Sequence, residues 1–423
     1  PGVSGTFTGG GGRCPLYSPE LVGSLGGVCE RTRAADNLLV ASVLEVQEGS
    51  PFASCEGLEN VCTTFIQGEW KPAAACGGAA DADGGSSEEE EVLELVVPAD
   101  GSDGEDVIIE EEELGNDAPA SSPALNAEVE TLADGFEFTE GPIWIPATGA
   151  NSSLPNATLL FSDMRTNTIY SWSEADGIGV YSNNSMGTNG KALDLDGQLV
   201  GFRSGPRNVA RGADPETAQV VASEYEGARF NSPNDGAVNP VDGAIFFSDP
   251  IWGILARPNE TQELDFHGIY RIDADDASLS LELGGLAMPN GVAFSEEGDI
   301  LFVSDTGGLP IHPTPELRSD EPPPTISAWA LQDGRVLQPP VPLWSREDFS
   351  DGMCYNDRGL WSTRSGMGPS EYGPKGLVLT DPATGQEIGH IPIDAPTNVE
   401  CHTDQDGVLY VTSANKISKV TLL

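Results

Sequence analysis

Residues 125–423 repeat one pattern of polar and hydrophobic positions six times. Each repeat begins with a polar residue that precedes a glycine by about eight or nine positions, and a short hydrophobic run follows. The runs are rich in β-branched and aromatic residues and are bounded by Gly, Pro, Asn and Asp, which is typical of β-strands. The six polar positions are Glu140, Asn189, Asn234, Asn290, Asp351 and Asn398.

The repeats predict an all-β fold, a six-bladed β-propeller over residues 125–423. A second strand-like run often follows the first, and the repeats are spaced near the ~40–50 residues expected of four-stranded propeller blades. A two-sheet sandwich does not explain a sixfold repeat, and a parallel α/β fold needs long amphipathic helices that the sequence lacks. Because the innermost strand of each blade lines a central channel, we expect the six polar positions to meet at one mouth of it.

The segment before the propeller divides into two parts. Residues 81–124 are acidic and of low complexity, and residues 81–130 contain no Lys or Arg, which indicates a linker. Residues 1–80 are rich in glycine and form a predicted extension or cap. This part contains five cysteines, Cys14, Cys29, Cys55, Cys62 and Cys76. They favour a module held together by disulfides, although the sequence does not determine how they pair.

The two remaining cysteines lie within predicted blades. Cys354 and Cys401 are expected to be buried small hydrophobic residues rather than nucleophiles. No C-x-x-C segment is present, which disfavours a thiolate zinc site.

Composition limits the classes of partner. The net charge is -47, with 67 acidic against 20 basic residues, and this balance excludes nucleic acid as the expected partner. No apolar run of about 18 residues occurs, so we expect no membrane span. Four N-glycosylation sequons are present, at Asn151, Asn156, Asn183 and Asn259. Together with the cysteines and a first residue other than Met, they favour a secreted protein. We expect the protein to be monomeric.

Four of the repeated positions have the chemistry of a hard metal site. Glu140, Asn234, Asn290 and Asp351 supply two carboxylates and two amides from equivalent places in four blades. Such oxygen donors favour one divalent cation, with Ca²⁺ ahead of Mg²⁺ and Mn²⁺, and Zn²⁺ is less favoured without histidine. The preference of polar residues for turns explains any one of these four residues by itself, whereas four at equivalent positions of different blades favour a metal site.

Four short segments occur in a specific combination and order: Glu140-Gly-Pro-Ile-Trp144, Arg229-Phe-Asn-Ser-Pro-Asn-Asp235, Pro289-Asn-Gly-Val-Ala-Phe-Ser295 and Asp351-Gly-Met-Cys354. Together they resemble the senescence-marker-protein/gluconolactonase/luciferin-regenerating-enzyme family, whose animal member is regucalcin. The resemblance covers about residues 130–423 and leaves residues 1–120 outside. It implies a six-bladed propeller that binds one catalytic divalent cation and hydrolyses a lactone.

The same resemblance implies roles for individual residues. Glu140, Asn290 and Asp351 are the expected direct metal ligands, and Asp351 is also the expected general base. Asn234 lies at the position that contacts the metal or the substrate. The cation would polarise the lactone carbonyl, and a water deprotonated by Asp351 or by the metal would attack it.

Other residues are predicted to contact the small-molecule lactone. They are Asn189, Arg203, Arg229 and Asn231, in addition to Asn234. Arg203 has an alternative role in a structural salt bridge, because acidic residues are abundant. The segment Val399-Glu-Cys-His402 departs from the Phe-Gly-Gly run that family members usually carry, so we expect the last blade to differ there.

Three functions are compatible with the sequence. The first is metal-dependent lactone hydrolysis, and the second is phosphotriesterase-like hydrolysis on the same cation. The third is a non-catalytic secreted propeller that binds calcium or a partner through its rim, which the loss of Asp351 would have favoured. No G-x-S-x-G segment supports a serine hydrolase.

Overall fold

The computed structural model describes the chain as two units, Pro1–Asp117 and Ala118–Leu423. In the first unit the structure describes only the backbone of four strands, which pair in the order β1-β3-β2-β4: β1 (Thr6–Thr8), β2 (Leu25–Thr32), β3 (Leu39–Glu45) and β4 (Glu69–Pro72). In the second unit it describes residues 122–147, 154, 156–257, 259–307, 322–365 and 372–423. The acidic segment 81–121 and the pairing of the five N-terminal cysteines lie outside the described residues.

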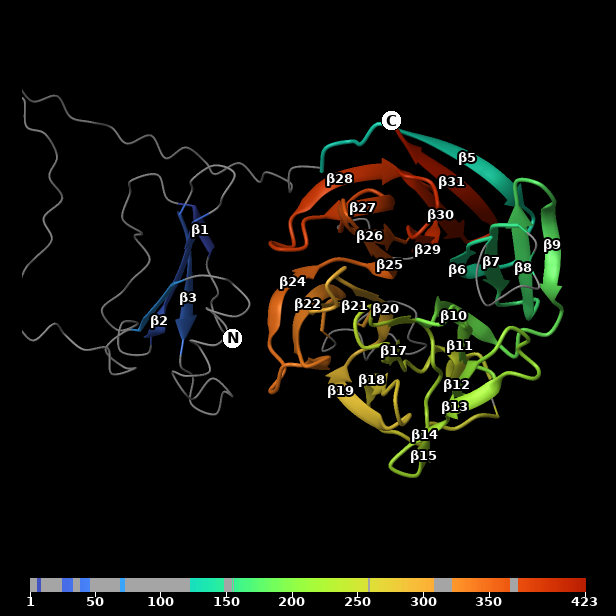
Figure 1. The fold of residues 1–423 in the computed structure, drawn as a ribbon, viewed down its shortest axis with the longest axis horizontal. Coiled ribbons are helices and arrows are strands. Elements are labelled where there is room, and N and C mark those ends of the chain that lie inside the picture. Colours follow the sequence, from blue (N-terminus) through green and yellow to red (C-terminus); the bar gives the residue numbers. More distant parts are fainter. Residues whose placement is uncertain are drawn as a thin grey trace, which may run out of the picture. The chain divides into compact units, whose positions relative to one another are not determined.

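The described part of the second unit is a ring of six antiparallel sheets (Figure 1), which we number as blades 1 to 6. Blade 1 is β6 (Thr139–Ile145), β7 (Thr158–Asp163), β8 (Thr168–Ser173) and β9 (Gly177–Ser182). Blade 2 is β10 (Thr188–Leu193), β11 (Leu199–Arg203), β12 (Asn208–Arg211) and β13 (Gln219–Ala222). Blade 3 is β16 (Gly236–Val238), β17 (Ile245–Ser248), β18 (His267–Ile272) and β19 (Leu279–Leu286). The ring confirms the six-bladed β-propeller predicted from the repeats.

The remaining blades follow the same plan. Blade 4 is β20 (Pro289–Phe294), β21 (Ile300–Asp305), β22 (Thr325–Gln332), β23 (Arg335–Val336) and β24 (Pro342–Glu347). Blade 5 is β25 (Ser350–Asn356), β26 (Gly359–Arg364), β27 (Gly376–Thr380) and β28 (Glu387–Pro392). Between blades 2 and 3 lies a hairpin, β14 (Glu224–Tyr225) and β15 (Ala228–Arg229), and a short helix, α2 (Trp252–Leu255), follows β17.

Blade 6 closes the ring with strands from both ends of the propeller. It consists of β29 (Pro396–Glu400), β30 (Val408–Ser413), β31 (Lys416–Leu422) and β5 (Ala127–Asp134). β5 pairs antiparallel with β31 from Ala127 opposite Leu422 to Asp134 opposite Lys416. This pairing joins the two ends of the propeller chain within one sheet and covers the outer edge of β31.

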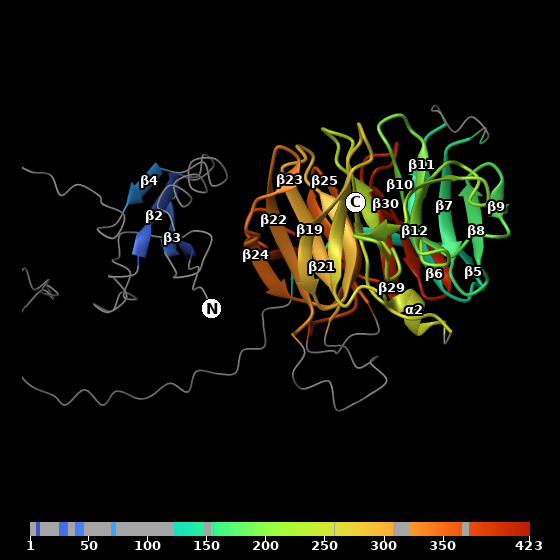
Figure 2. The same cartoon turned by 90° about the horizontal axis from the view of Figure 1, so that it is seen from below.

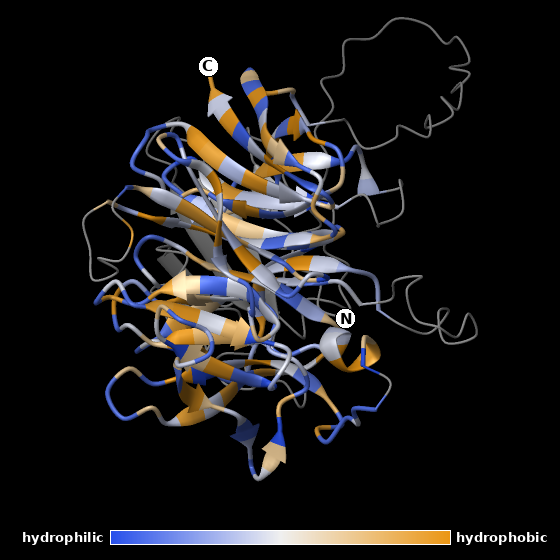
Figure 3. Cartoon of the chain, turned by 90° about the vertical axis from the view of Figure 1, so that its right-hand side faces the viewer, coloured by the Kyte–Doolittle hydropathy of each residue, from blue (hydrophilic) through white to orange (hydrophobic). Residues whose placement is uncertain are grey.

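The hydrophobic core lies between neighbouring blades. The second strands β7, β17 and β30 are buried at every position, because each blade packs between two others. The outer strand β9 has no fully buried position. Aromatic rings join the blades, as where Phe202 of blade 2 stacks on Phe247 of blade 3 with ring centroids 6.2 Å apart. Hydrophobic residues accordingly recur along the strands, and the loops are mostly hydrophilic (Figure 3).

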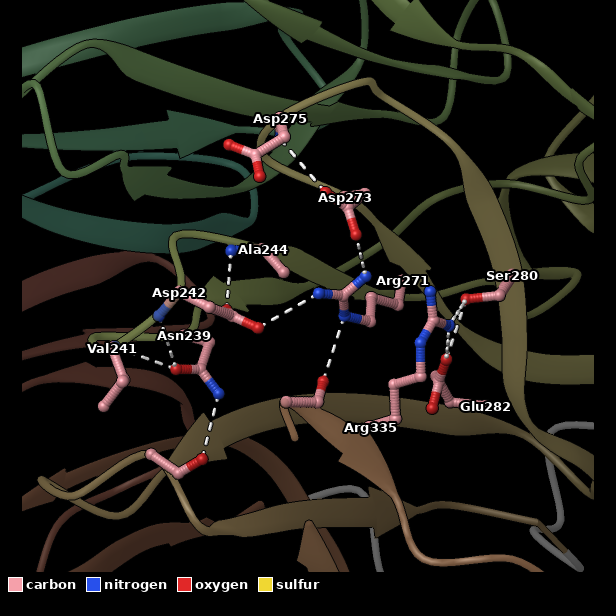
Figure 4. A network of polar contacts seen from close by, with 12 residues as sticks. Asn239, Val241, Asp242, Ala244, Arg271, Asp273, Asp275, Ser280, Glu282 and Arg335 are labelled. Atoms are coloured by element: carbon pink, nitrogen blue, oxygen red, sulfur yellow. Dashed lines mark hydrogen bonds and ion pairs between the residues drawn. The ribbon is translucent and has the colours of Figure 1, made fainter. Parts of the chain in front are cut away.

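A polar network joins blades 3 and 4 where β16 ends (Figure 4). The buried guanidinium of Arg271 donates to Asp242 at 3.0 Å and to Asp273 at 2.7 Å within blade 3. It also donates to the carbonyl of Gly334 in blade 4 at 3.0 Å. Close by, the Asn239 amide donates to the carbonyl of Gly298 at 2.9 Å. These bonds fix the two blades at the ends of the inner strands.

A disulfide joins blades 5 and 6. Cys354 of β25 and Cys401, which directly follows β29, form it with their Cα atoms 5.8 Å apart. Both residues are buried as expected, but they are bonded to each other, a pairing that the sequence did not predict. Because they occupy equivalent positions of adjacent inner strands, their side chains meet across the interface between the blades. No helix in the described part of the chain has the length and apolar character needed to cross a membrane.

Candidate metal centre

A repeated dipeptide, a polar residue followed by glycine, or by valine in blade 6, lies at or near the start of each innermost strand: Glu140-Gly141, Asn189-Gly190, Asp235-Gly236, Asn290-Gly291, Asp351-Gly352 and Asn398-Val399. In blade 3 the residue directly before the glycine is Asp235, and Asn234 lies one position earlier. The strand register shifts close to this dipeptide in five blades. Such bulges redirect the side chain away from the sheet.

The glycines make room for the polar side chain of the next blade. A Cβ atom at Gly190 would overlap the carboxylate of Asp235, and one at Gly352 would overlap the amide of Asn398. Since even a methyl group does not fit there, glycine lets neighbouring site residues approach closely. The repeated dipeptide is therefore a packing requirement of the cluster as well as turn chemistry.

Hydrogen bonds connect the polar side chains across the ring. The Asn290 amide donates to Asp351 Oδ1 at 2.6 Å, and the Asn189 amide donates to Asn234 Oδ1 at 3.0 Å. The Asn398 amide donates to Asp235 Oδ2 at 3.0 Å, which links blade 6 to blade 3 on the far side of the ring. These bonds join the predicted residues Asn189, Asn234, Asn290 and Asp351 in pairs and add Asp235 and Asn398. The predicted residue Glu140 lies close enough to Asp351 and Asp235 for their charges to raise its pKa.

Hydroxyl groups at the ends of the second strands hold the backbone of this cluster. Ser304 Oγ donates to the carbonyl of Asp351 at 2.8 Å and accepts from the N–H of Gly291 at 2.7 Å, so it ties blade 4 to blade 5. Thr363 Oγ1 donates to the carbonyl of Gly352 at 3.0 Å and lies 2.9 Å from that of Thr397, between blades 5 and 6. These contacts preorganise the site residues on rigid strands.

The cluster holds three buried carboxylates, and their charges interact. Burial raises the pKa of Asp351 to about 7, the charge of Asp235 adds to this rise, and the bond from Asn290 opposes it. Burial first, and then the charges of Asp351 and Asp235, raise the pKa of Glu140 well above its ordinary value. Burial likewise raises the pKa of Asp235 to about 6. Like charges crowded away from water favour protonation, or neutralisation by a cation.

One buried cation, Lys191, lies beside the carboxylates in the described structure. Its ammonium donates to the carbonyl of Gly141 at 2.8 Å and to Ser162 Oγ at 2.7 Å. Burial lowers its pKa to about 7, while the charges of Asp235 and Glu140 oppose that change. A single lysine leaves the excess of negative charge in the cluster uncompensated.

The residues present fit a hard divalent cation. Three buried carboxylates and several amide oxygens lie near the start of the inner strands, and oxygen donors of this kind suit Ca²⁺ or Mg²⁺. Asn189 Oδ1 is buried without a hydrogen-bond partner among the described residues, which adds an unsatisfied acceptor. A divalent cation would offset both the charge excess and the missing partner.

The three remaining predicted contact residues bind protein groups. Arg203 donates to Asn208 Oδ1 at 2.7 Å and to the carbonyl of Pro215 at 2.8 Å within blade 2. Arg229 is 44% exposed and lies 3.5 Å from Glu260 in an ion pair.

The third of these residues, Asn231, is fully buried. Its amide donates to the carbonyls of Asp249 and Phe266 at 3.2 and 2.9 Å. The structure does not bring Arg203, Arg229 or Asn231 into hydrogen bonds with the cluster.

The sequons differ in their surroundings. Asn183 and Asn259 are exposed, whereas the Asn156 amide donates to Asp176 Oδ2 at 2.8 Å. Asn151 lies outside the described residues.

Sequence reasoning missed two members of the cluster and undervalued a third. Asp235 was missed because Asn234 was matched to the polar residues of the other blades. Matching the glycines instead places Asp235, directly before Gly236, at the equivalent position. Lys191 follows Asn189 by two positions in an inner strand, where a charged residue is unusual. Asn398 is one of the six repeated positions but was not among the predicted ligands or substrate contacts, and it bonds to Asp235 inside the cluster.

The fold and the cluster define a six-bladed β-propeller with an acidic centre where its inner strands begin. The family model described as the SMP-30/Gluconolactonase/LRE-like region matches residues 138–415. The chain belongs to this family, which confirms the resemblance seen in the sequence.

Individual relatives agree with this assignment. The chain is 27% identical to a gluconolactonase of Zymomonas mobilis over 329 residues, which cover 71% of this chain and 84% of that protein. A solved gluconolactonase from Xanthomonas campestris is 28% identical with a TM-score of 0.59 over 72% of this chain and 96% of its own. Regucalcin from Agrobacterium tumefaciens, a calcium-binding protein, is 16% identical with a TM-score of 0.51 over 72% and 97% of the two chains, and shares the fold.

Proposed function

We propose that the propeller is a divalent-cation-dependent lactonase of the gluconolactonase type. The observation that carries the proposal is the cluster of three buried carboxylates, Glu140, Asp235 and Asp351, at one end of the inner strands. Supporting it, the chain aligns with most of the length of a gluconolactonase, at 27% identity over 84% of that protein.

Glu140, Asn290 and Asp351 would hold the cation, with Asn234 beside them. When bound, a divalent cation of this kind supplies Lewis-acid polarisation of a carbonyl and electrostatic stabilisation of developing negative charge. We expect Ca²⁺ at this site, because carboxylate and amide oxygens are its preferred protein ligands.

Asp351 is the proposed general base. Its carboxylate takes a proton from a water molecule as the water oxygen forms a bond to the lactone carbonyl carbon. The ring C–O bond then breaks, and the leaving alkoxide takes up a proton to give the free hydroxy acid. Without a cation, burial and the charge of Asp235 raise the pKa of this carboxylate to about 7. A bound cation would lower that pKa and keep Asp351 ionised, which is the form that a general base needs.

Asn234 and Asn189 are proposed to orient the substrate. Their side chains are joined at 3.0 Å, so a ligand that binds one amide positions the other. Amide groups donate to and accept from hydroxyl groups, which favours a polyhydroxylated lactone over an aliphatic one. The rigid strands hold these amides in place before the substrate arrives.

Proton release measured with a pH indicator tests the proposal against aldonolactones, aliphatic lactones and organophosphates. We expect turnover of aldonolactones that a chelator abolishes and Ca²⁺ restores. Hydrolysis of organophosphates alone would favour phosphotriesterase-like chemistry instead. Tight Ca²⁺ binding without turnover of any substrate would refute the enzyme and leave a calcium-binding propeller.

A further inference from the structure

A second group of ligand atoms lies along the two strands joined by the disulfide. Cys354 and Cys401 each lie three residues after a member of the acidic cluster, Asp351 and Asn398. Their sulfur atoms and Nδ1 of His402 all lie within 4.8 Å of one another. Within the described residues this is the one compact group of three or more His, Cys, Asp or Glu ligand atoms.

A fourth donor completes the group. Oε1 of Glu400 lies 3.3 Å from Nδ1 of His402 and 3.9 Å from the sulfur of Cys354. Nδ1 of His402 lies 3.4 Å from the same sulfur. Bond lengths of about 2.0–2.3 Å around tetrahedral zinc place neighbouring ligand atoms roughly 3.3–3.7 Å apart. Three of the four donors therefore already have spacings close to the edges of such a tetrahedron.

The surroundings hold these donors in fixed orientations. Oε2 of Glu400 accepts the backbone N–H of Trp144 in blade 1 at 3.1 Å. Oε1 of Glu400 accepts the backbone N–H of His402 at 2.6 Å, and the backbone N–H of Cys401 donates to the sulfur of Cys354 at 3.0 Å. Bonds of this kind, behind the ligand atoms, orient metal ligands and support their charge.

In the oxidised protein the two sulfur atoms are bonded to each other and supply no thiolate. Glu400 is buried and His402 has 72% of its side chain exposed, so the group extends from the interior to the surface. The group differs from the acidic cluster in chemistry as well as in position, because thiolate and imidazole ligands favour zinc over calcium.

We propose that reduction of the Cys354–Cys401 disulfide creates a Zn²⁺ site whose ligands are Cys354, Cys401, His402 and Glu400. A dithiol reductant transfers two electrons and two protons to the S–S bond, giving two thiols and its own cyclic disulfide. Binding of Zn²⁺ then releases both thiol protons to solvent as the Zn–S bonds form. Rotation of the Cys401 side chain provides the separation between the two sulfur atoms that a tetrahedral site needs.

The test uses the full chain, reduced with dithiothreitol and freed of it by gel filtration without oxygen. Co²⁺ serves as the probe, because thiolate ligation produces an intense sulfur-to-cobalt charge-transfer band that oxygen ligands at the acidic cluster do not produce. The Cys354→Ser/Cys401→Ser variant measures what the five N-terminal cysteines contribute. We expect reduced wild type to bind one more equivalent of thiolate-ligated Co²⁺ than this variant, and Zn²⁺ to displace it. The oxidised protein should lack this extra band.

His402→Ala separates zinc ligation from loss of the cysteines. The exposed side chain can be removed without disturbing the core, and the variant retains the same number of thiols. We expect its affinity for Co²⁺ at this site to fall at least about tenfold, since even the loss of an outer-shell partner has that effect. Equal Co²⁺ spectra in reduced wild type and the double serine variant would overturn the proposal. Unchanged affinity in His402→Ala would also overturn it, and that comparison holds even if the double variant does not fold.

Discussion

At the scale of single residues, the acidic centre depends on side chains that the fold keeps out of water. Asp351 illustrates this: its carboxylate is buried, receives a bond from Asn290 at 2.6 Å, and has its backbone carbonyl held by Ser304. The position and the basicity of the Asp351 carboxylate are thus both determined by neighbouring residues from other strands. Replacing a single atom of such a group tests its role without removing its volume.

Asp351→Asn should lower kcat for lactone hydrolysis by about 10²–10⁴-fold, the range typical of lost general-base catalysis. The amide has nearly the shape of the carboxylate, so the circular dichroism spectrum should be unchanged. Asp406→Asn, which alters a carboxylate whose side chain is 90% exposed, is the matched control and should retain full activity. Wild-type turnover in Asp351→Asn would assign the base to another group.

Lys191→Met should destabilise the propeller by about 1–3 kcal/mol, the cost typical of leaving buried hydrogen-bonding groups without their partner. The change leaves Ser162 and the carbonyl of Gly141 without their donor and increases the excess of negative charge. Added Ca²⁺ should therefore raise the thermal midpoint more in this variant than in wild type. Lys375→Met, at an exposed position, is the control; equal responses of both variants to Ca²⁺ would argue against this role of Lys191.

At the scale of strands and blades, the ring is held by contacts that differ from one interface to the next. The interface of blades 2 and 3 is aromatic, that of blades 3 and 4 has the Arg271 network, and blades 5 and 6 share a disulfide. The order of the elements around the ring is visible in Figure 1, and the layering of the blades is seen from the side in Figure 2. Each interface can therefore be weakened separately.

Arg271→Met should lower the free energy of unfolding by about 2–4 kcal/mol, because several buried hydrogen bonds to a charged group are lost together. The variant leaves Asp242 and Asp273 without their common partner. Arg358→Met removes an ion pair in which the Asp406 side chain is 90% exposed, and should change stability by no more than about 1 kcal/mol. Denaturant unfolding of the two variants measures the difference, and similar losses in both would contradict a special role for the network.

The sequence predicted the ring and most of the acidic centre, for a physical reason. Strand patterns and repeated dipeptides are local, and a sixfold repeat restricts how they can be arranged. The partners of individual side chains are not local. The sequence left open whether Arg203 contacts a substrate or has a structural role, and only the folded chain supplies its partners, Asn208 and the carbonyl of Pro215. The Cys354–Cys401 bond likewise depends on which inner strands become neighbours.

At the scale of the whole molecule, the balance of charge links stability to pH and to cations. Burial raises the pKa of Asp351 to about 7 and that of Asp235 to about 6. In the cation-free protein, these groups bind protons more tightly when folded than when unfolded. Their contribution to stability is therefore greatest below about pH 4 and is lost as the pH rises towards 7.

Ca²⁺ should remove much of this loss, since a bound divalent cation stabilises the ionised carboxylates. The difference in thermal midpoint between Ca²⁺-loaded and chelator-treated protein should be small at about pH 5 and larger at about pH 8. Buffers matched in ionic strength control for screening of the net charge of -47. A difference that is independent of pH would place the cation away from these carboxylates.

The pairing of β5 with β31 has a consequence for how the protein folds during its synthesis. The ribosome makes β5 before every other strand of the propeller and β31 after them, so blade 6 is incomplete until β31 has emerged. Blades 1 to 5 can form in order during translation, but the growing arc exposes the hydrophobic faces of its end blades and leaves β5 unpaired, and such surfaces are prone to associate with other chains. Glu140 in blade 1 and Asn398 in blade 6 come together only when the arc closes, so the acidic centre can assemble only after the last blade has been made.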